Sequence, residues 1–242
     1  MKREYFRWHS PNLEREMELL VFGHAGEKVL IFPTRDGRFH EYEDIRMVEA
    51  MAPRVQAGEL QLFCIDSVAH ESFYCFWCDP AGRVKRHNEF EKYVLEEVMP
   101  FLERCNPDGR TVAHGCSLGA FHAVNIALRH PALFSRVVAF SGRYDLTLTV
   151  EEFKDLFDGY YDEEIYYHNP SHYLPNLRCE ATLDLIRALD ITLVIGDEDP
   201  FVENNRQFAE VLRGQGIGHR LHVWQGRAHK GHYWRRMAAE YL

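Results

Sequence analysis

The sequence has no hydrophobic run long enough to span a membrane and no continuous apolar segment of signal-peptide length. It also has no block of basic residues, and its 28 basic against 37 acidic residues give a formal net charge of −9. Such a charge balance repels a phosphate backbone or an anionic lipid surface on average. We therefore expect a cytoplasmic protein whose partner is neither a nucleic acid nor a membrane.

Cysteines are few as well, and only Cys75 and Cys78 lie close together, as a C-x-x-C inside an aromatic run. No second pair follows to complete a four-ligand zinc site, and six cysteines without a secretory signal predict reduced thiols. Four histidines near the C-terminus lack a carboxylate or thiol at metal-ligand spacing: His219, His222, His229 and His232. The sequence therefore predicts neither a metal nor an organic cofactor.

Internal repeats, low-complexity segments and Ser/Gly-rich linkers are also absent. What is present is a chain of 242 residues that is 46% hydrophobic, which is enough for one substantial core. We expect a single domain over 1–242. The sequence leaves the oligomeric state open.

Short apolar runs bounded by turn residues alternate with segments whose apolar residues recur every three or four positions, which predicts alternating strands and helices. Segments 4–8 and 17–22 are joined by a turn too short for a crossover helix, so they predict an antiparallel hairpin. Further strands are expected at 28–32, 60–65, 111–114, 137–140, 191–195 and 221–224. Helices are expected at 45–55, 90–104, 118–129 and 203–213. This order predicts an α/β fold with a mostly parallel eight-stranded sheet and helices on both faces.

Residues 143–187 depart from this alternation, because they carry many aromatic residues interleaved with acids and prolines. The segment is either an insertion that walls a pocket or an aromatic-rich packing segment, since tyrosines serve both burial and recognition. The aromatic candidates for lining an acyl or aryl pocket are Tyr144, Tyr160, Tyr161 and Trp234.

The most informative motif is the G-x-S-x-G pentapeptide from Gly115 to Gly119. A strand-like run precedes it and a helix-like run follows it, which is the context of a nucleophile elbow. There, small residues let helix and strand approach while the serine, here Ser117, adopts a strained conformation with its hydroxyl exposed. A surface turn with a solvated serine is the alternative for the bare motif.

Several short motifs in a fixed order resemble α/β-hydrolase serine esterases of the esterase D type. They are Gly115 to Ala120, Arg129 to Phe134, Ser141-Gly142, Gly196 to Pro200 and His229 to Trp234. The resemblance covers roughly Lys28 to the C-terminus and implies an α/β-hydrolase fold. It also implies a serine hydrolase with the chain order Ser, Asp or Glu, His.

A serine hydroxyl is a poor nucleophile until an imidazole takes its proton, so a histidine must come within hydrogen-bond reach of Ser117. The resemblance favours His229 as that base and His232 as its rival, because the family's ending has Asp and Trp where this chain has Lys230 and Gly231. The family's G-x-x-D pattern selects Asp199 as the acid. Asp197 is the alternative, although it could instead bond backbone amides of the loop.

A tetrahedral intermediate needs two preorganised donors, and the N–H of Leu118, which follows the nucleophile, supplies one. The second should come from the loop after the strand at 28–32, where Thr34 or Arg35 is the candidate and Arg35 is preferred. Relatives often carry a His-Gly or Asp-Gly dipeptide there, and this loop departs from that pattern. An ordinary Asp36-Gly37 turn is the competing interpretation.

These observations predict a serine esterase that cleaves a carboxylic ester or thioester of a small molecule through an acyl-Ser117 intermediate. Alternatives are an acyltransferase of the same fold, a peptidase, or a binding protein that keeps the fold without catalysis. A preference for small or soluble acyl groups is expected, because no amphipathic lid suited to a lipid interface is evident.

Overall fold

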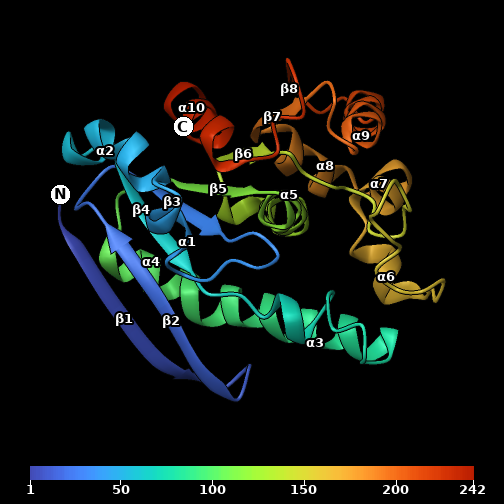
Figure 1. Cartoon of the computed structure of the whole chain (residues 1–242), viewed down its shortest axis with the longest axis horizontal. Helices are drawn as coiled ribbons and strands as arrows, with labels where there is room; N and C mark the ends of the chain where they lie inside the picture. The colour runs from blue at the N-terminus through green and yellow to red at the C-terminus, as the bar shows by residue number, and fades with distance from the viewer.

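The computed structural model describes residues 1–242, which build one eight-stranded sheet in the order β1-β2-β4-β3-β5-β6-β7-β8 (Figure 1). The strands are β1 (Arg3–Ser10), β2 (Arg15–Phe22), β3 (Glu27–Phe32), β4 (Leu60–Ile65), β5 (Thr111–Cys116), β6 (Arg136–Phe140), β7 (Asp190–Gly196) and β8 (His219–Trp224). The hairpin β1-β2 is antiparallel, as is the β2-β4 pair, and all the other pairs are parallel. The eight-stranded α/β fold with an N-terminal hairpin is therefore confirmed.

Helices connect the parallel strands and cover both faces of the sheet (Figure 1). The longer helices are α2 (Met47–Gln56), α3 (Pro80–Tyr93), α4 (Met99–Cys105), α5 (Leu118–Arg129), α8 (Glu180–Arg187), α9 (Val202–Gly214) and α10 (Gly231–Tyr241). The short elements are α1 (Glu41–Asp44), η1 (Ala69–Glu71), η2 (Val94–Val98), η3 (Pro131–Leu133), α6 (Glu163–Tyr167), α7 (Pro170–Tyr173) and η4 (Leu174–Asn176). No helix combines the length and the apolar character needed to cross a lipid bilayer.

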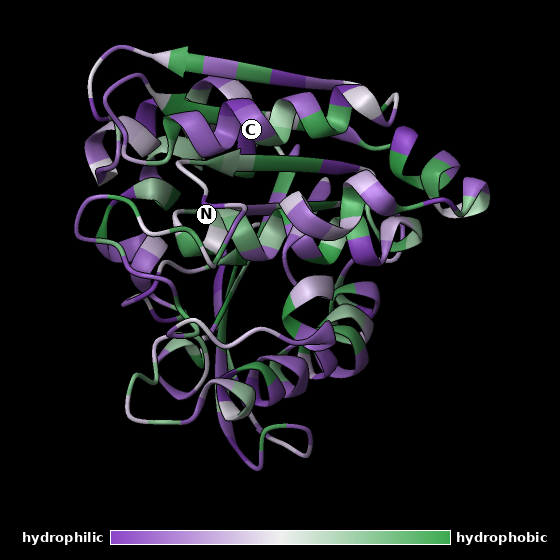
Figure 2. Ribbon diagram, turned by 90° about the vertical axis from the view of Figure 1, so that its right-hand side faces the viewer, coloured by the Kyte–Doolittle hydropathy of each residue, from purple (hydrophilic) through white to green (hydrophobic).

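Two hydrophobic cores lie on opposite faces of the sheet, because successive strand residues point to opposite sides. In β3, Leu30 belongs to the core beneath α3, α5 and α9, whereas its neighbour Val29 belongs to the core beneath α2 and α10. Figure 2 shows the hydrophobic colour concentrated on the inner strands and mixed with hydrophilic colour on the surrounding helices. Burial on both faces explains why these strands read as nearly continuous apolar runs.

The expected helix at 90–104 is longer and less regular than predicted. It begins at Pro80, where Asp79 accepts a hydrogen bond from the Gly82 N–H at 2.9 Å, and a π-helical turn, η2, separates α3 from α4. Asp at the N-cap followed by Pro is a strong helix start. The first turns were missed because their buried residues include Arg83 and His87, which carry no apolar periodicity.

The expectation of six reduced thiols is wrong for Cys75 and Cys78, which form a disulfide. Their Cα atoms are 5.3 Å apart in a tight turn, a spacing suited to a disulfide that the sequence alone leaves undetermined. Arg83 donates hydrogen bonds to the carbonyls of both cysteines and to that of Leu156. The loop is thereby fixed against the segment that follows β6.

Candidate active site

Ser117 lies at the turn between β5 and α5, at the carboxyl end of the sheet. Its backbone has φ 56° and ψ −120°, a conformation that non-glycine residues rarely adopt. The Ser117 N–H donates to the carbonyl of Phe140 at 2.8 Å, which ties the turn to the end of β6. The strand, the strained serine and the following helix form the nucleophile elbow that the sequence motif predicts.

The two glycines of the motif are required by the close approach of strand and helix. A Cβ on Gly115 would lie 2.3 Å from the Gly119 carbonyl carbon, and one on Gly119 would lie 2.2 Å from the Phe32 carbonyl oxygen. The start of α5 therefore packs directly against the end of β3. This contact brings the loop after β3 next to Ser117.

A chain of hydrogen bonds joins Ser117, His229 and Asp199, which lie far apart in the sequence. His229 Nε2 is 3.0 Å from Ser117 Oγ, and His229 Nδ1 is 2.7 Å from Asp199 Oδ2. Asp199 follows β7 and His229 follows β8, so the parallel topology places both on the same sheet edge as Ser117. The Asp199 side chain has no exposure to solvent, and that of His229 is 17% exposed.

The alternative acid and base candidates from the sequence lie outside this hydrogen-bond chain. Asp197 Oδ1 accepts a hydrogen bond from the Gly226 N–H at 2.7 Å, the loop-bonding role considered for it. His232 is exposed and its ring packs at a tilt against Tyr233, whereas His222, in β8, packs on Tyr241 of α10. Neither histidine has a hydrogen bond to Ser117.

Asp199 is held by its own loop and by the segment after β6. Its Oδ1 accepts the Phe201 N–H at 3.0 Å, and the Arg143 guanidinium lies 5.3 Å from the Phe201 ring centroid. Burial lowers the pKa of Arg143, which donates to the carbonyls of Asp145, Leu146, Leu148 and Lys154. Arg143 therefore fixes the start of the 143–187 segment beside the loop that carries Asp199.

Sequence reasoning missed a second contact that fixes His229. The Trp234 indole N–H donates to Ser141 Oγ at 3.1 Å, and the Ser141 hydroxyl donates to the Ala228 carbonyl at 3.2 Å. The Trp234 and His229 rings meet edge to face with centroids 5.5 Å apart. Trp234 is buried, so it supports the histidine and does not line a pocket. The Ser-Gly motif after β6 is the signal that could have indicated this contact.

Two backbone N–H groups form no hydrogen bond within the protein: that of Leu118, which follows Ser117, and that of Arg35, in the loop after β3. The Thr34 N–H instead donates to Glu41 Oε2 at 2.8 Å, and the Thr34 hydroxyl donates to Glu41 Oε1. Burial raises the pKa of Glu41, and the Thr34 hydrogen bonds oppose that rise. Thr34 is thus occupied, which leaves Arg35 as the loop's candidate donor.

The aromatic residues named from the sequence divide between surface and core. Tyr160 and Tyr161 are exposed, whereas Tyr144 is fully buried against Phe208 and cannot line a pocket. Tyr74, which was not singled out, has the Arg35 guanidinium 5.1 Å from its ring centroid. The residue before the disulfide therefore packs against the side chain of Arg35, in the loop after β3.

Comparison with known proteins places the chain in a family. Residues 36–240 match the sequence model of the Esterase family, described as "Putative esterase". No curated protein sequence matches the chain. The structure is similar to a ferulic acid esterase, at 17% identity and TM-score 0.79, covering 100% of this chain and 96% of that one.

Two further solved structures have the same fold. One is a Staphylococcus aureus fluorophosphonate-binding serine hydrolase, at 14% identity and TM-score 0.76, covering 99% of this chain and 96% of that one. The other is an S-formylglutathione hydrolase from Agrobacterium tumefaciens, at 16% identity and TM-score 0.76, covering 99% and 92%. The fold is thus the α/β-hydrolase fold, and the match over most of its length shows that the chain belongs to the Esterase family.

Proposed function

We propose that this esterase uses Ser117 as its nucleophile, His229 as general base and Asp199 as the acid that orients the base. The observation that carries the proposal is the continuous hydrogen-bond chain from Ser117 Oγ through both nitrogens of His229 to Asp199. An imidazole with one nitrogen on a hydroxyl and the other on a buried carboxylate is the arrangement that activates a serine.

Attack proceeds in two stages in this proposal. Ser117 Oγ adds to the carbonyl carbon of the ester while His229 Nε2 takes its proton, and the imidazolium then gives that proton to the departing alcohol. Water repeats the sequence on the acyl-Ser117 intermediate and releases the acid. Asp199 holds the His229 Nδ1–H throughout and stabilises the cation without being protonated.

The oxyanion of each tetrahedral intermediate would be held by the N–H groups of Leu118 and Arg35. Support comes from their lack of any partner within the protein and from the direct contact between the start of α5 and the end of β3. Donors that are already in position need no reorganisation as negative charge develops on the oxygen. Such preorganised donors usually make the largest single contribution to the rate enhancement.

The substrate is proposed to be a small carboxylic ester or thioester with a short or soluble acyl group. An acyltransferase would use the same acyl-Ser117 intermediate but pass it to an alcohol other than water, and a peptidase would cleave an amide. Product analysis with short-chain, aryl, thioester and amide substrates, with and without added alcohol, distinguishes these activities. Faster turnover of long-chain emulsified esters would contradict the proposed acyl preference.

Fluorophosphonate labelling tests the nucleophile. We expect the wild type to be labelled at Ser117 and the Ser117→Ala variant to be unlabelled while keeping its thermal unfolding midpoint. The matched control is Ser135→Ala, which removes a hydroxyl that binds only the Thr111 carbonyl. An intact wild type that resists labelling and hydrolyses no ester would instead favour the non-catalytic binding protein.

A cytoplasmic location remains part of the proposal. Four of the six cysteines are free, and Cys105 and Cys179 are exposed. Exposed thiols suit a reducing compartment, whereas the Cys75–Cys78 disulfide is less common there. Fractionation of cells that express the native gene tests the location, and recovery outside the cytoplasm would contradict it.

A further inference from the structure

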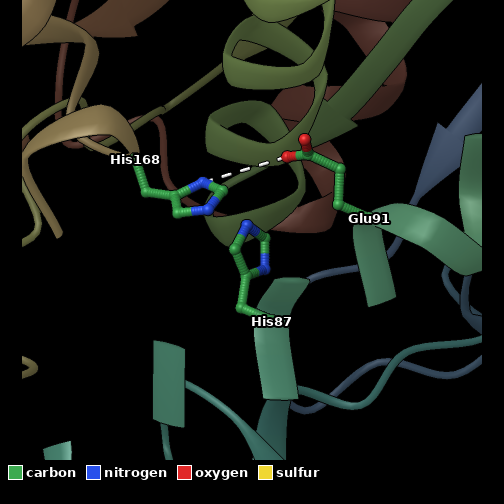
Figure 3. Close-up of side chains that lie close together, drawn as sticks. All are labelled: His87, Glu91 and His168. Atoms are coloured by element: carbon green, nitrogen blue, oxygen red, sulfur yellow. Dashed lines mark ion pairs between the residues drawn. The ribbon is translucent and has the colours of Figure 1, made fainter. Parts of the chain in front are cut away.

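A cluster of buried histidine and glutamate side chains lies against α5, the helix that follows Ser117. His87 and Glu91 come from α3, one helical turn apart, and His168 follows α6 (Figure 3). All three are buried, and one potential ligand atom from each lies within 4.8 Å of the others. Asn125, which also borders the cluster, follows Ser117 by eight residues and so lies about 12 Å along α5 from it.

His87 has an unmet requirement for a partner. Neither of its ring nitrogens has a hydrogen bond within the protein, although only 3% of the residue is exposed. The ring packs between aromatic groups, with the Phe73 ring centroid at 4.2 Å and that of His122 at 5.3 Å. A buried polar group without a partner costs free energy, so a ligand for at least one nitrogen is expected.

His168 has an unprotonated ring nitrogen close to a carboxylate. The Asn88 amide donates to Glu164 at 2.8 Å, which fixes its carbonyl oxygen on His168 Nε2 at 2.5 Å. A carbonyl only accepts, so Nε2 carries the proton and Nδ1 carries a lone pair. Nδ1 lies 3.8 Å from Glu91 Oε2 (Figure 3). The Asn125 amide donates to the same Nδ1 at 3.2 Å, so a hydrogen bond occupies the lone pair that a metal ion would take.

Two basic side chains hold the Glu91 carboxylate in place. His130 Nε2 lies 3.0 Å from Glu91 Oε1, and an Arg129 terminal nitrogen pairs with the same oxygen at 3.0 Å. The Arg129 Nε–H also donates to Oε2 at 3.2 Å, and Oε2 is the oxygen nearer to His168. Burial raises the pKa of Glu91, but His130 and Arg129 outweigh burial and lower it to about 2. Burial lowers the pKa of His168 to about 4 and that of His87 well below its usual value.

Asn125 offers a fourth possible metal-ligand atom, its side-chain oxygen. Its Nδ2 lies 3.2 Å from His168 Nδ1, and its Oδ1 has no partner in the protein. A 180° rotation of the amide would direct Oδ1 to the same point. A cavity of about 10 Å³, the size of a single small occupant, lies beside this cluster and is bordered by His87, Glu91 and Asn125 but not by His168.

We propose that His87, Glu91, His168 and the Asn125 carboxamide oxygen bind one divalent transition-metal ion, for which Zn²⁺ is the best match. Two imidazole nitrogens with a carboxylate form a donor set that Zn²⁺ accepts in proteins. Ligand atoms around a tetrahedral Zn²⁺ are roughly 3.3 Å apart, so the side chains close in on binding. Arg129 pairs with Glu91 and so opposes a second cation there, which weakens binding.

The ion's role would be structural. It would tie α3 and α5 to the 143–187 segment through His168, and it takes no part in the proposed chemistry at Ser117. In metal sites a ligating histidine commonly donates its other ring N–H to a carbonyl, as His168 does to the Asn88 side chain. The i, i+4 spacing of His87 and Glu91 is visible in the sequence, but His168 gives no sequence signal.

The test starts from chelator-treated protein titrated with Co²⁺ alone and then with Zn²⁺. We expect one equivalent of Co²⁺ with the intense visible absorption of a low-coordinate site, its displacement by Zn²⁺, and a thermal midpoint raised by several degrees. Absence of binding at millimolar metal would overturn the proposal, and a buried water would then be the partner of these groups.

Variants locate the bound ion. His87→Gln and His168→Gln should each weaken binding at least tenfold, whereas His232→Gln, which changes an exposed histidine, should leave it unchanged. Unchanged binding in both cluster variants would place the ion on surface histidines and overturn the proposal. Should the cluster variants fail to fold, anomalous scattering from a Zn²⁺-soaked wild-type crystal decides, since a peak must lie between His87 and His168.

Discussion

The indole N–H of Trp234 donates a hydrogen bond to Ser141 Oγ at 3.1 Å, joining the C-terminal helix α10 to the end of β6. The same ring packs edge to face on His229. A contact between two elements that close the site thus positions the proposed base without touching the substrate.

This relationship predicts a rate effect for Trp234→Phe, which keeps a ring but loses the donor. Losing one neutral hydrogen bond, worth about 0.5–1.5 kcal/mol, should lower kcat by up to roughly tenfold with little change in KM. The matched control is Trp224→Phe, which removes a similar bond to Tyr241 at 3.1 Å and should lower only the thermal midpoint. Equal kcat losses in both variants would refute a positioning role for Trp234.

His229→Ala should lower kcat/KM by on the order of a thousandfold or more, because members of such a triad act as a unit. His232→Ala should change it little, since that exposed side chain has no bond to Ser117. Steady-state kinetics on a soluble ester measure both. The reverse outcome would place the base at His232 while leaving the esterase family unchanged.

Asp199→Asn should reduce kcat by roughly 10⁴-fold with the fold intact, because the histidine loses the charge that stabilises its cation and fixes its tautomer. Asp197→Asn makes the same chemical change on the same loop. It should keep near-normal rates, since an amide oxygen can still accept the Gly226 N–H. Comparable kinetic losses in the two variants would argue against Asp199 as the acid.

The proposed oxyanion donor at position 35 is a backbone group, so side-chain removal and N–H removal should differ. Arg35→Ala keeps the N–H and should retain most of the activity. Arg35→Pro removes it and should lower kcat by about 10²–10³-fold. Thermal unfolding of both variants controls for loss of structure. Full activity in the proline variant would exclude this donor.

Stability should fall on acidification, because four buried histidines remain neutral in the folded protein, and burial lowers the pKa of one of them, His87, well below its usual value. Burial lowers the pKa of His114 to about 4, of His122 to about 3 and of His168 to about 4. Between the ordinary histidine pKa of 6.5 and these values the unfolded chain binds more protons, so stability drops as pH falls from about 6.5 to 4. Glu91, whose pKa is lowered to about 2, extends the loss from about pH 4.5 downward.

Urea unfolding at intervals from pH 7.5 to 4 measures this dependence. His122→Phe removes one titrating ring from an aromatic cluster in which it forms no hydrogen bond, so the slope below pH 6.5 should become shallower. The exposed His70 provides the control His70→Gln, whose slope should match the wild type. A His122→Phe slope identical to that of the wild type would show that His122 is not the titrating group.

The sequence by itself determined the order of the eight strands, the four helices expected at 45–55, 90–104, 118–129 and 203–213, and the position of the elbow, but not the helices α8 and α10. The apolar runs indicated strands that are buried on both faces of the sheet, and Gly115 and Gly119 indicated close contact between a strand and a helix. Both signals are local in the sequence. The resemblance to the esterase D type is confirmed by the family match and the shared fold. The assignment of individual catalytic roles stays a prediction until the variants are measured.

Only the tertiary structure decided which of several similar side chains meet. Asp199 and Asp197 are two residues apart, yet one reaches His229 and the other bonds the Gly226 N–H. The Cys75–Cys78 disulfide and the approach of His168 to Glu91 likewise depend on chain paths that local patterns do not encode. The physical reason is that hydrogen bonds and ligand sites form between atoms a few ångströms apart, and packing alone brings distant segments to that distance.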